Sequence, residues 1–451
     1  MKVALFVHCF FPDHFYGTET YTLQLAQDLQ ALGHEVVVVA GVFQGEPRRA
    51  GLVTRYDYAG ISVVAIDKNF EPHTRIRETY WQETMRPHFR ALLSDLKPDV
   101  VHVTHLVNHT AVLLEEAKSA GYPLVGTLTD FFGFCFNNRL EAANGSSCTG
   151  PNMLRSNCIA CFLKAISDRQ RQELKVLNRV PFGFQFGGLA LRLAGLPRSV
   201  VPDIVRRPSI LHRAYDAYDA MIAPTRFLRG EYVRNGFDPN RVTVSRFGVD
   251  LDRSPKPVRP SGTPLIVGFI GQIAAHKGVD ILVQAARSVP AGQICLRVYG
   301  PHNQDPAYMA RLRMMAGPET KFLGTFPPAQ IGEVLAGIDL LAVPSRWHEN
   351  SPLVLLNALA SHTPVLVSNV AGLTEFVTDE KDGWCFRRGD CADLARRLAF
   401  LAANPQRCRE LSNRTTYERT VRSMTEDVVS VYEYAWTTQQ RGRDHAVTQE
   451  K

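Results

Sequence analysis

The sequence predicts an α/β protein made of two doubly wound domains. Short buried-strand patterns alternate with helical patterns along the chain, and this alternation stops at one Pro-rich segment and then starts again. The length of 451 residues agrees, because it exceeds one ordinary hydrophobic core and suits two. Hydrophobic residues make up 45% of the chain and charged residues 21%, which is the balance of a globular protein.

A strand–helix–strand unit opens the chain. Residues 2–7 (KVALFV) have a buried-strand pattern, and an amphipathic helical pattern follows a loop. Thr18 is the expected N-cap of that helix, and Gly33 ends it before a strand at residues 35–40. Such a unit belongs to a parallel sheet. Further strand patterns lie at residues 61–66, 99–103, 123–128, 219–224 and 241–245.

The alternation restarts after a segment that is rich in proline and poor in apolar residues, which is typical of a linker. Strand patterns then lie at residues 265–271, 293–300, 321–324, 339–344 and 363–368. The predicted organisation is an N-terminal domain at 1–253, a linker at 254–264, a C-terminal domain at 265–422, a helix at 423–438 that returns to the first domain, and a disordered polar tail at 439–451. The first domain includes a cysteine-rich stretch at 135–161 and a helical insertion at about 162–212.

A helix is predicted to begin shortly after Glu349. Asn350 and Ser351 are good N-cap residues, and Pro352 suits the first helical position. The first backbone N–H groups of a helix have no intrahelical partner, and the helix dipole favours negative charge there. The mouth of this helix is therefore a candidate binding site for a phosphate.

The order of polar groups along this segment fits a nucleotide-diphosphate sugar. The groups expected around the phosphates are Asn350, Ser351 and the backbone N–H groups of Leu353 and Val354. Glu349 would bind the sugar hydroxyls on one side of the helix mouth. Asn357 stands about 10 Å further along the helix, at 1.5 Å per residue, and would bind the ribose.

Two positions outside this helix agree with a donor site. Lys277 comes one short loop after the strand at residues 265–271, where a cation can neutralise the charge of a departing diphosphate. Gly17 follows the first strand and its loop, and its lack of a side chain lets a ligand approach the backbone. Because ligands bind beyond the carboxyl ends of strands in such sheets, we expect the two domains to face one cleft.

The sequence resembles the retaining glycosyltransferases of family 4, which have the GT-B fold of two Rossmann-like domains. The resemblance rests on residues 12–39 (PDHFYGTETYTLQLAQDLQALGHEVVVV), 216–250 (DAYDAMIAPTRFLRGEYVRNGFDPNRVTVSRFGVD), 268–280 (GFIGQIAAHKGVD) and 347–377 (WHENSPLVLLNALASHTPVLVSNVAGLTEFV). It implies that a sugar moves from a nucleotide sugar with retained anomeric configuration, and that no metal takes part in that step. It also implies that Glu349 contacts the donor sugar, that Lys277 contacts the diphosphate, and that Gly17 belongs to the glycine loop near the phosphates.

The sequence departs from the family pattern at three positions. Asn357 replaces the second acid of the E-x7-E motif, and an amide bonds ribose hydroxyls without a charge-assisted bond. Gln272 stands where the family usually has arginine. Thr129 stands before Asp130 where the family often has a histidine that contacts the donor sugar. We expect Thr129, Asp130 and His105 to line the cleft, with His105 as a contact for an acceptor hydroxyl.

Four cysteines, Cys135, Cys148, Cys158 and Cys161, are candidates for a structural zinc site. Four thiolates with one C-x-x-C pair suit tetrahedral zinc, although the other spacings are looser than in a motif with two such pairs. Reduced cysteines and a disulfide are the alternatives, and a disulfide is disfavoured in the cytosol.

Charge and hydropathy restrict the kinds of binding partner that the sequence allows. The net charge of +7 suits an anionic substrate, an anionic membrane surface or merely a solvated surface. No basic run with interleaved aromatic residues indicates nucleic acid. The basic and apolar mixture at residues 162–212 fits either buried helices or peripheral membrane contact. No stretch reaches membrane-spanning length, so we expect a cytoplasmic protein, at most at the inner face of the membrane.

The predicted function is sugar transfer from a UDP- or GDP-linked donor to a glycan or lipid-linked acceptor, in polysaccharide, glycolipid or other glycoconjugate biosynthesis. Two alternatives remain open. One is a nucleotide-sugar epimerase with a GT-B-like fold, which would need acid and base carboxylates around the sugar. The other is a nucleotide-sugar-binding subunit that has lost catalysis through the changes at Thr129 and Asn357.

Overall fold

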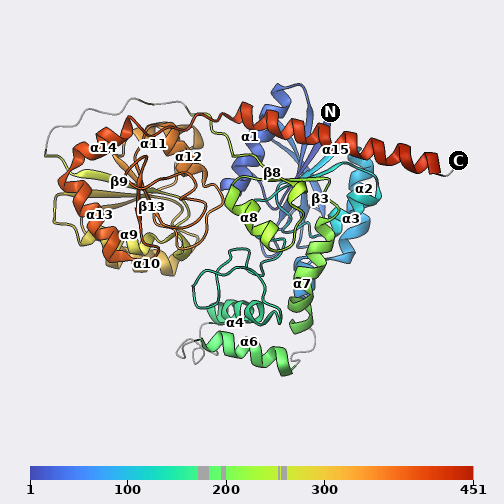
Figure 1. The fold of residues 1–451 in the computed structure, drawn as a ribbon, viewed down its shortest axis with the longest axis horizontal. Helices are drawn as coiled ribbons and strands as arrows, with labels where there is room; N and C mark the ends of the chain where they lie inside the picture. The colour runs from blue at the N-terminus through green and yellow to red at the C-terminus, as the bar shows by residue number, and fades with distance from the viewer. Residues whose placement is uncertain (171–181, 195–199, 252–253, 255–261, 450–451) are drawn as a thin grey trace. The chain divides into compact units, whose positions relative to one another are not determined.

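The computed structural model describes residues 1–170, 182–194, 200–251, 254 and 262–449, and it divides into two compact units (Figure 1). Unit 1 comprises Met1–Arg246 and Val421–Lys451, and unit 2 comprises Phe247–Thr420. The predicted boundary at residue 253 thus lies inside unit 2. Most of the predicted linker at 254–264 lies outside the described residues.

Unit 1 is built on one eight-stranded sheet with the order β3-β4-β2-β1-β5-β6-β7-β8. Its strands are β1 (Lys2–Val7), β2 (Glu35–Val42), β3 (Val53–Tyr58), β4 (Ile61–Asp67), β5 (Val100–Val103), β6 (Leu124–Thr127), β7 (Ala220–Ala223) and β8 (Val242–Val244). All neighbouring strands pair in parallel except β3, which pairs antiparallel with β4 at the sheet edge. Since β1 lies at the centre beside β2 and β5, the loops that follow these strands leave the same sheet edge.

The described helices of unit 1 connect these strands. They are α1 (Gly17–Ala31), α2 (Arg86–Leu96), α3 (Val112–Ser119), α4 (Ser156–Gln170), α6 (Gly183–Ala194), α7 (Val200–Tyr215), α8 (Arg226–Arg234) and α15 (Val421–Gln449), with the 3-10 turns η1 (Ile76–Thr79), η2 (Glu83–Met85) and η3 (Pro239–Arg241). The expected N-cap at Thr18 is wrong, because Tyr16 is the N-cap and makes no side-chain cap bond. Helices α4, α6 and α7 occupy the described part of the predicted insertion.

The last helix returns to unit 1. Helix α15 contacts α1, β6 and β7, and the Tyr432 hydroxyl lies 2.7 Å from Nδ1 of the buried His102 on β5. The helix continues to Gln449, so the tail predicted to be disordered from residue 439 is helical over most of its length. None of the helices in the described part of the chain has both the length and the apolar character needed to cross a membrane.

Unit 2 is a smaller parallel sheet with helices on both faces. The strand order is β11-β10-β9-β12-β13-β14, and every neighbouring pair is parallel. The strands are β9 (Leu265–Ile270), β10 (Ile294–Tyr299), β11 (Thr320–Gly324), β12 (Leu340–Val343), β13 (Val365–Ser368) and β14 (Trp384–Phe386). The helices and turns are η4 (Ala275–Lys277), α9 (Val279–Arg287), α10 (Pro306–Met315), η5 (Pro328–Gln330), α11 (Ile331–Ala336), α12 (Leu353–Ala360), α13 (Cys391–Ala403) and α14 (Pro405–Ser412).

Alternating strand residues divide the core of unit 2 into two layers. Leu340 and Leu366 pack with α9, α10, α13 and α14 on one face, whereas Leu341 and Val365 pack with α11 and α12 on the other. This alternation is the consequence of a strand period of two residues. The strands β9 and β12 are neighbours at the point where the strand order reverses, so the loops that follow them meet at one edge.

Candidate functional site

The centre of the candidate site in unit 2 is an ion pair between residues far apart in the sequence. Lys277 Nζ lies 2.8 Å from Glu349 Oε1. Lys277 ends the 3-10 turn after β9, and Glu349 lies in the loop between β12 and α12. The lysine side chain also lies over the ring of Trp347, with Nζ 5.0 Å from the ring centroid. The structure therefore brings together the two residues that the sequence analysis assigned to the donor sugar (Glu349) and to the departing diphosphate (Lys277).

Glu349 is buried, with 5% of its surface exposed, and its carboxylate is held by three donors. Besides Lys277, the Ser345 hydroxyl and the Trp347 indole N–H donate to Oε1, the latter at 2.9 Å. Burial alone would raise the pKa of Glu349, but the Lys277 charge and these hydrogen bonds outweigh it and hold the pKa below its usual value. The carboxylate is therefore ionised at neutral pH.

Two glycines allow backbone segments to close around this pair. A Cβ at Gly278 would lie 1.9 Å from the carbonyl oxygen of Pro344, and one at Gly372 would lie 1.6 Å from the carbonyl oxygen of Glu349. Their φ angles are +72° and +87°, in the left-handed region that favours glycine. Gly278 thus seats the Lys277 loop against the end of β12, and Gly372 seats the loop after β13 against Glu349.

The helix mouth differs in detail from the expectation. Neither Asn350 nor Ser351 is the N-cap, because the cap is Pro352 and the helix begins at Leu353. Ser351 has a φ of +68°, which is not the extended conformation of an N-cap residue. Its side chain is 2% exposed, and its hydroxyl has no hydrogen-bond partner among the described residues. A buried hydroxyl without a partner is costly, so this oxygen is suited to a ligand.

The remaining donor-binding candidates lie around these groups. Leu353 and Val354 are the first residues of α12, as the phosphate prediction requires. The Asn357 side-chain amide donates to the Leu353 carbonyl at 2.9 Å, within its own helix. Gln272 is half-buried and follows β9 by two residues. No contact of the described residues tests a nucleotide role for Gln272 or Asn357, so both stay predictions.

In unit 1 the three cleft candidates meet at the carboxyl ends of β5 and β6. His105 Nε2 lies 3.1 Å from Asp130 Oδ2, and the Val107 N–H donates to His105 Nδ1 at 3.2 Å. The second bond makes Nδ1 the acceptor, so Nε2 carries the proton and donates to the carboxylate. The Thr129 hydroxyl donates to the Thr104 carbonyl at 3.0 Å.

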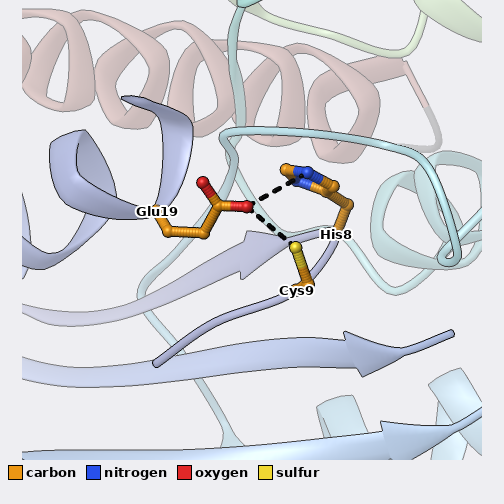
Figure 2. Close-up of side chains that lie close together, drawn as sticks. All are labelled: His8, Cys9 and Glu19. Carbon is orange, nitrogen blue, oxygen red and sulfur yellow. Dashed lines mark hydrogen bonds and ion pairs between the residues drawn. The ribbon is translucent and has the colours of Figure 1, made fainter. Parts of the chain in front are cut away.

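A second polar cluster lies beside them at the end of β1 (Figure 2). The Cys9 thiol donates to Glu19 Oε1 at 2.8 Å, and His8 Nε2 lies 3.3 Å from the same oxygen. The His8 ring lies 4.2 Å from that of His105, centroid to centroid. Burial, followed by the influence of His105, lowers the pKa of His8 well below its usual value. Gly17 begins α1 close by, and a Cβ there would meet no atom within 4 Å, which leaves room for a ligand.

Several residues of the site were missed by the sequence analysis. They are Ser345, Trp347, Gly372 and Glu19. Ser345 and Trp347 stand in the same strand-to-helix loop as Glu349, and that position was the available signal. Gly372 and Glu19 carried no signal of their own, because their roles depend on contacts between distant loops.

Comparisons with known proteins agree with this architecture. The structure of the HepE protein of Anabaena in complex with UDP and glucose superposes with a TM-score of 0.62 at 14% identity, covering 96% of this chain and 99% of that one. Sucrose-phosphate synthase of Thermosynechococcus elongatus superposes with a TM-score of 0.59 at 17% identity, covering 99% of both chains. The fold is therefore that of the GT-B glycosyltransferases.

Two family models match the sequence. "Glycosyl transferases group 1" matches residues 251–417, and "Glycosyl transferase 4-like domain" matches residues 16–156. The chain belongs to the family 4-like glycosyltransferases of the GT-B fold. It is 32% identical over 245 residues to D-inositol 3-phosphate glycosyltransferase of Nocardia farcinica and 32% identical over 225 residues to alpha-maltose-1-phosphate synthase of Mycolicibacterium smegmatis. The match to the Nocardia enzyme covers 50% of this chain and 54% of that protein, and the match to the Mycolicibacterium enzyme covers 44% and 57%. The chain thus spans only about half the length of these relatives.

Proposed function

We propose that the protein is a retaining glycosyltransferase that moves a sugar from a nucleoside-diphosphate sugar to an acceptor hydroxyl. The observation that carries this proposal is the ion pair between Lys277 and the buried Glu349, in the loop that also carries Ser351, whose buried hydroxyl has no hydrogen-bond partner among the described residues. The Lys277 cation suits a diphosphate, and the Glu349 carboxylate suits sugar hydroxyls. The N-terminus of α12 suits a phosphate oxygen.

In the proposed reaction the bond between the anomeric carbon and the diphosphate oxygen breaks, and the acceptor oxygen bonds to that carbon on the same face. The acceptor proton passes to the departing phosphate oxygen, so no protein nucleophile is required. Lys277 and the N–H groups of Leu353 and Val354 would stabilise the charge that develops on the leaving group. Glu349 would hold the sugar hydroxyls, and its contact with Lys277 would place the sugar beside the diphosphate.

The donor proposed here is linked to UDP or GDP. HepE of Anabaena, a neighbour in fold, has been solved with UDP and glucose and with UDP-glucose, which supports UDP as the first nucleotide to test. We expect the transfer step to need no metal, and the route to be polysaccharide, glycolipid or other glycoconjugate biosynthesis in the cytoplasm.

A lipid-linked acceptor at the inner membrane face is the acceptor we propose. Helix α6 exposes Phe186 (66% exposed), Leu189 (37%) and Leu193 (75%). Their spacing of three and four residues puts them on one side of the helix. On the opposite side, the buried Phe184 packs with Ala160 and Leu163 of α4. An exposed apolar stripe on a protein of net charge +7 suits an anionic lipid surface.

Flotation with vesicles tests this surface. Wild-type protein should float with phosphatidylglycerol vesicles and less with phosphatidylcholine vesicles, because anionic lipid adds electrostatic attraction. The pair of changes Phe186→Ser and Leu193→Ser should abolish flotation, whereas the control Leu323→Ser, which removes an exposed leucine from β11 of unit 2, should not. Equal flotation of all three proteins would contradict membrane contact through α6.

A panel of UDP- and GDP-linked sugars tests the reaction. Wild-type protein, without added divalent cation, should release UDP or GDP from at least one of them, and NMR should find the anomeric configuration of the transferred sugar retained. Glu349→Ala should abolish the release, whereas Glu410→Ala, at an exposed carboxylate on α14 of the same unit, should not. Inverted configuration would contradict the mechanism. Nucleotide binding without release from any donor would favour a non-catalytic binding subunit.

A further inference from the structure

The four cysteines singled out in the sequence surround one part of unit 1. Cys135 lies in the loop after β6, and Cys148 follows a short antiparallel bridge between Glu141 and Ser147. Cys158 and Cys161 lie one turn apart on α4, so their side chains leave the same face of the helix. All four are free thiols, and Cys135 and Cys158 are buried.

Two asparagines contact three of the four sulfurs. Asn137 lies between two of them: its Oδ1 accepts a hydrogen bond from the Cys135 thiol at 3.0 Å, and its Nδ2 donates to Cys161 Sγ at 3.8 Å. Asn157, which directly precedes Cys158, donates from Nδ2 to Cys148 Sγ at 3.6 Å. The loop after β6, the bridge segment and the start of α4 therefore converge on one group of sulfurs.

The surroundings of these sulfurs offer donors. The Gly150 N–H donates to Cys148 Sγ at 3.4 Å. Backbone N–H groups of Leu140, Arg139 and Asn137 lie close to the Cys135 sulfur. The other three cysteines lie close enough to Cys161 to interact with it electrostatically. Donors aimed at sulfur suit thiolates, and a bound cation would supply the charge that buried thiolates need.

We propose that Cys135, Cys148, Cys158 and Cys161 bind one zinc ion as four thiolates. Zinc takes four cysteine ligands in tetrahedral geometry with Zn–S bonds of about 2.3 Å, which places the sulfurs about 3.8 Å apart. The sulfurs are spaced more widely than this in the structure, since no three of them lie within 4.8 Å of one another. Metal binding would draw the loop and α4 together.

The role of the metal would be to anchor the α4–α6 segment. Arg207 of α7 donates to the Cys135 carbonyl, and Ala143 of the cysteine loop packs with Phe184 of α6 through α4. The same loop continues from Asp130, which holds His105. A zinc ion at this point would therefore fix both the helix that displays the apolar stripe and the loop that carries the cleft candidates. It would be structural, since four thiolate ligands would leave no open position for a substrate.

One other group competes for a metal. Among the described residues, His8, Cys9 and Glu19 are the only three whose candidate ligand atoms all lie within 4.8 Å of one another (Figure 2). In this trio the Glu19 carboxylate already accepts a hydrogen bond from the Cys9 thiol. The trio offers three ligand atoms, which already satisfy one another, whereas the four cysteines offer a complete set of four thiolates, so we assign the trio to hydrogen bonding. It provides a control for the zinc proposal.

Metal analysis of protein purified without a polyhistidine tag tests the proposal. Wild-type protein should contain about one zinc ion per chain, in line with a single four-thiolate site. The double variant Cys158→Ser with Cys161→Ser should lose the zinc, and Cys9→Ser should keep it. A zinc content near zero in wild-type protein overturns the proposal, and so does loss of zinc from Cys9→Ser.

A spectroscopic measurement keeps the proposal testable if the double variant does not fold. Wild-type protein refilled with Co²⁺ should show the near-ultraviolet absorption of thiolate-to-cobalt charge transfer and the visible bands of tetrahedral cobalt. The single change Cys148→Ser should reduce this absorption by about a quarter, one ligand of four, or abolish it. Absence of the charge-transfer absorption in wild-type protein overturns four-thiolate ligation.

Discussion

Lys277 Nζ and Glu349 Oε1 lie 2.8 Å apart although 72 positions separate the two residues in the chain. The contact exists because β9 and β12 are neighbours and the loops that follow them leave the same sheet edge. Burial of Glu349 means that the pair is only weakly screened by solvent, so removing either partner leaves an uncompensated charge. A diphosphate that binds Lys277 would meet a cation whose position is already fixed by the Glu349 carboxylate.

Because the backbone at Gly278 lies close to the Pro344 carbonyl, even a change to alanine should lower the free energy of unfolding strongly. Gly278→Ala would put a Cβ 1.9 Å from the Pro344 carbonyl oxygen at a φ of +72°. The matched control is Gly292→Ala, which has a φ of +76° and no atom within 4 Å of its Cβ. Both changes should cost about 1–2 kcal/mol of folding free energy from the left-handed backbone.

Gly278→Ala should cost about 1–3 kcal/mol more than the control, since the clash forces backbone movement. It should also reduce nucleotide binding, because the Lys277 loop would shift. Urea unfolding and calorimetry measure the two effects. Equal stability of the two variants would mean that the Gly278–Pro344 contact does not hold in solution.

Ser351→Ala should change stability and binding in opposite directions. The Ser351 hydroxyl is buried and unpartnered among the described residues, so its removal should leave folding stability unchanged or raise it by up to about 1 kcal/mol. If the hydroxyl binds a phosphate oxygen, the same change should weaken nucleoside diphosphate binding about fivefold, the loss of one hydrogen bond of about 1 kcal/mol. Unchanged affinity would place the ligand elsewhere, and a destabilised variant would mean that the hydroxyl has a partner in the free protein.

The burial of His102 should make the folding stability of the protein depend on pH. Burial lowers its pKa from 6.5 to about 3, and Nε2 and Nδ1 contact Thr127 and Tyr432. The unfolded chain therefore binds this proton more tightly than the folded chain. The contribution of His102 to the free energy of unfolding is complete above about pH 6.5 and is lost as the pH falls toward 3. About 2 kcal/mol of it is lost between pH 7 and pH 5.

The substitution His102→Gln should remove this part of the pH dependence. The variant should be less stable at neutral pH, because glutamine cannot replace both contacts of the buried ring. Between pH 7 and pH 5 it should lose about 2 kcal/mol less than wild-type protein, as measured by urea unfolding at each pH. The same loss in both proteins would show that His102 does not titrate with unfolding.

Most of the sheet could be predicted because parallel strands buried on both faces are nearly continuous apolar runs. Two strands were not predicted. β3 (VTRYDY) lies at a sheet edge and alternates half-buried with exposed residues, so it has no apolar run. β14 has only three residues, too few to show a period. The C-terminal helix was shortened in the prediction because its last turns are polar, although helix α15 continues to Gln449.

The candidate site could be predicted in outline because its main residues lie in the loops that follow strands. Lys277 and Glu349 were found by this rule together with the family resemblance. The N-cap was predicted wrongly, because capping preferences are local and the left-handed backbone of Ser351 is set by the tertiary contacts of the loop. The donors Ser345 and Trp347 could not be assigned to Glu349, since their orientation depends on the folded loop.

The central claim is that unit 2 binds a nucleoside-diphosphate sugar through Lys277 and Glu349, and calorimetric titration with UDP and GDP tests it most directly. Wild-type protein should bind at least one of the two nucleotides. Lys277→Ala should weaken that binding about 10- to 100-fold, the loss of a charged hydrogen bond of about 1.5–3 kcal/mol. Glu349→Ala should retain it, since Glu349 is assigned to the sugar, and Lys321→Ala, at an exposed lysine on β11, should not change it. Binding of neither nucleotide to wild-type protein, or equal binding to wild-type protein and Lys277→Ala, would contradict the account.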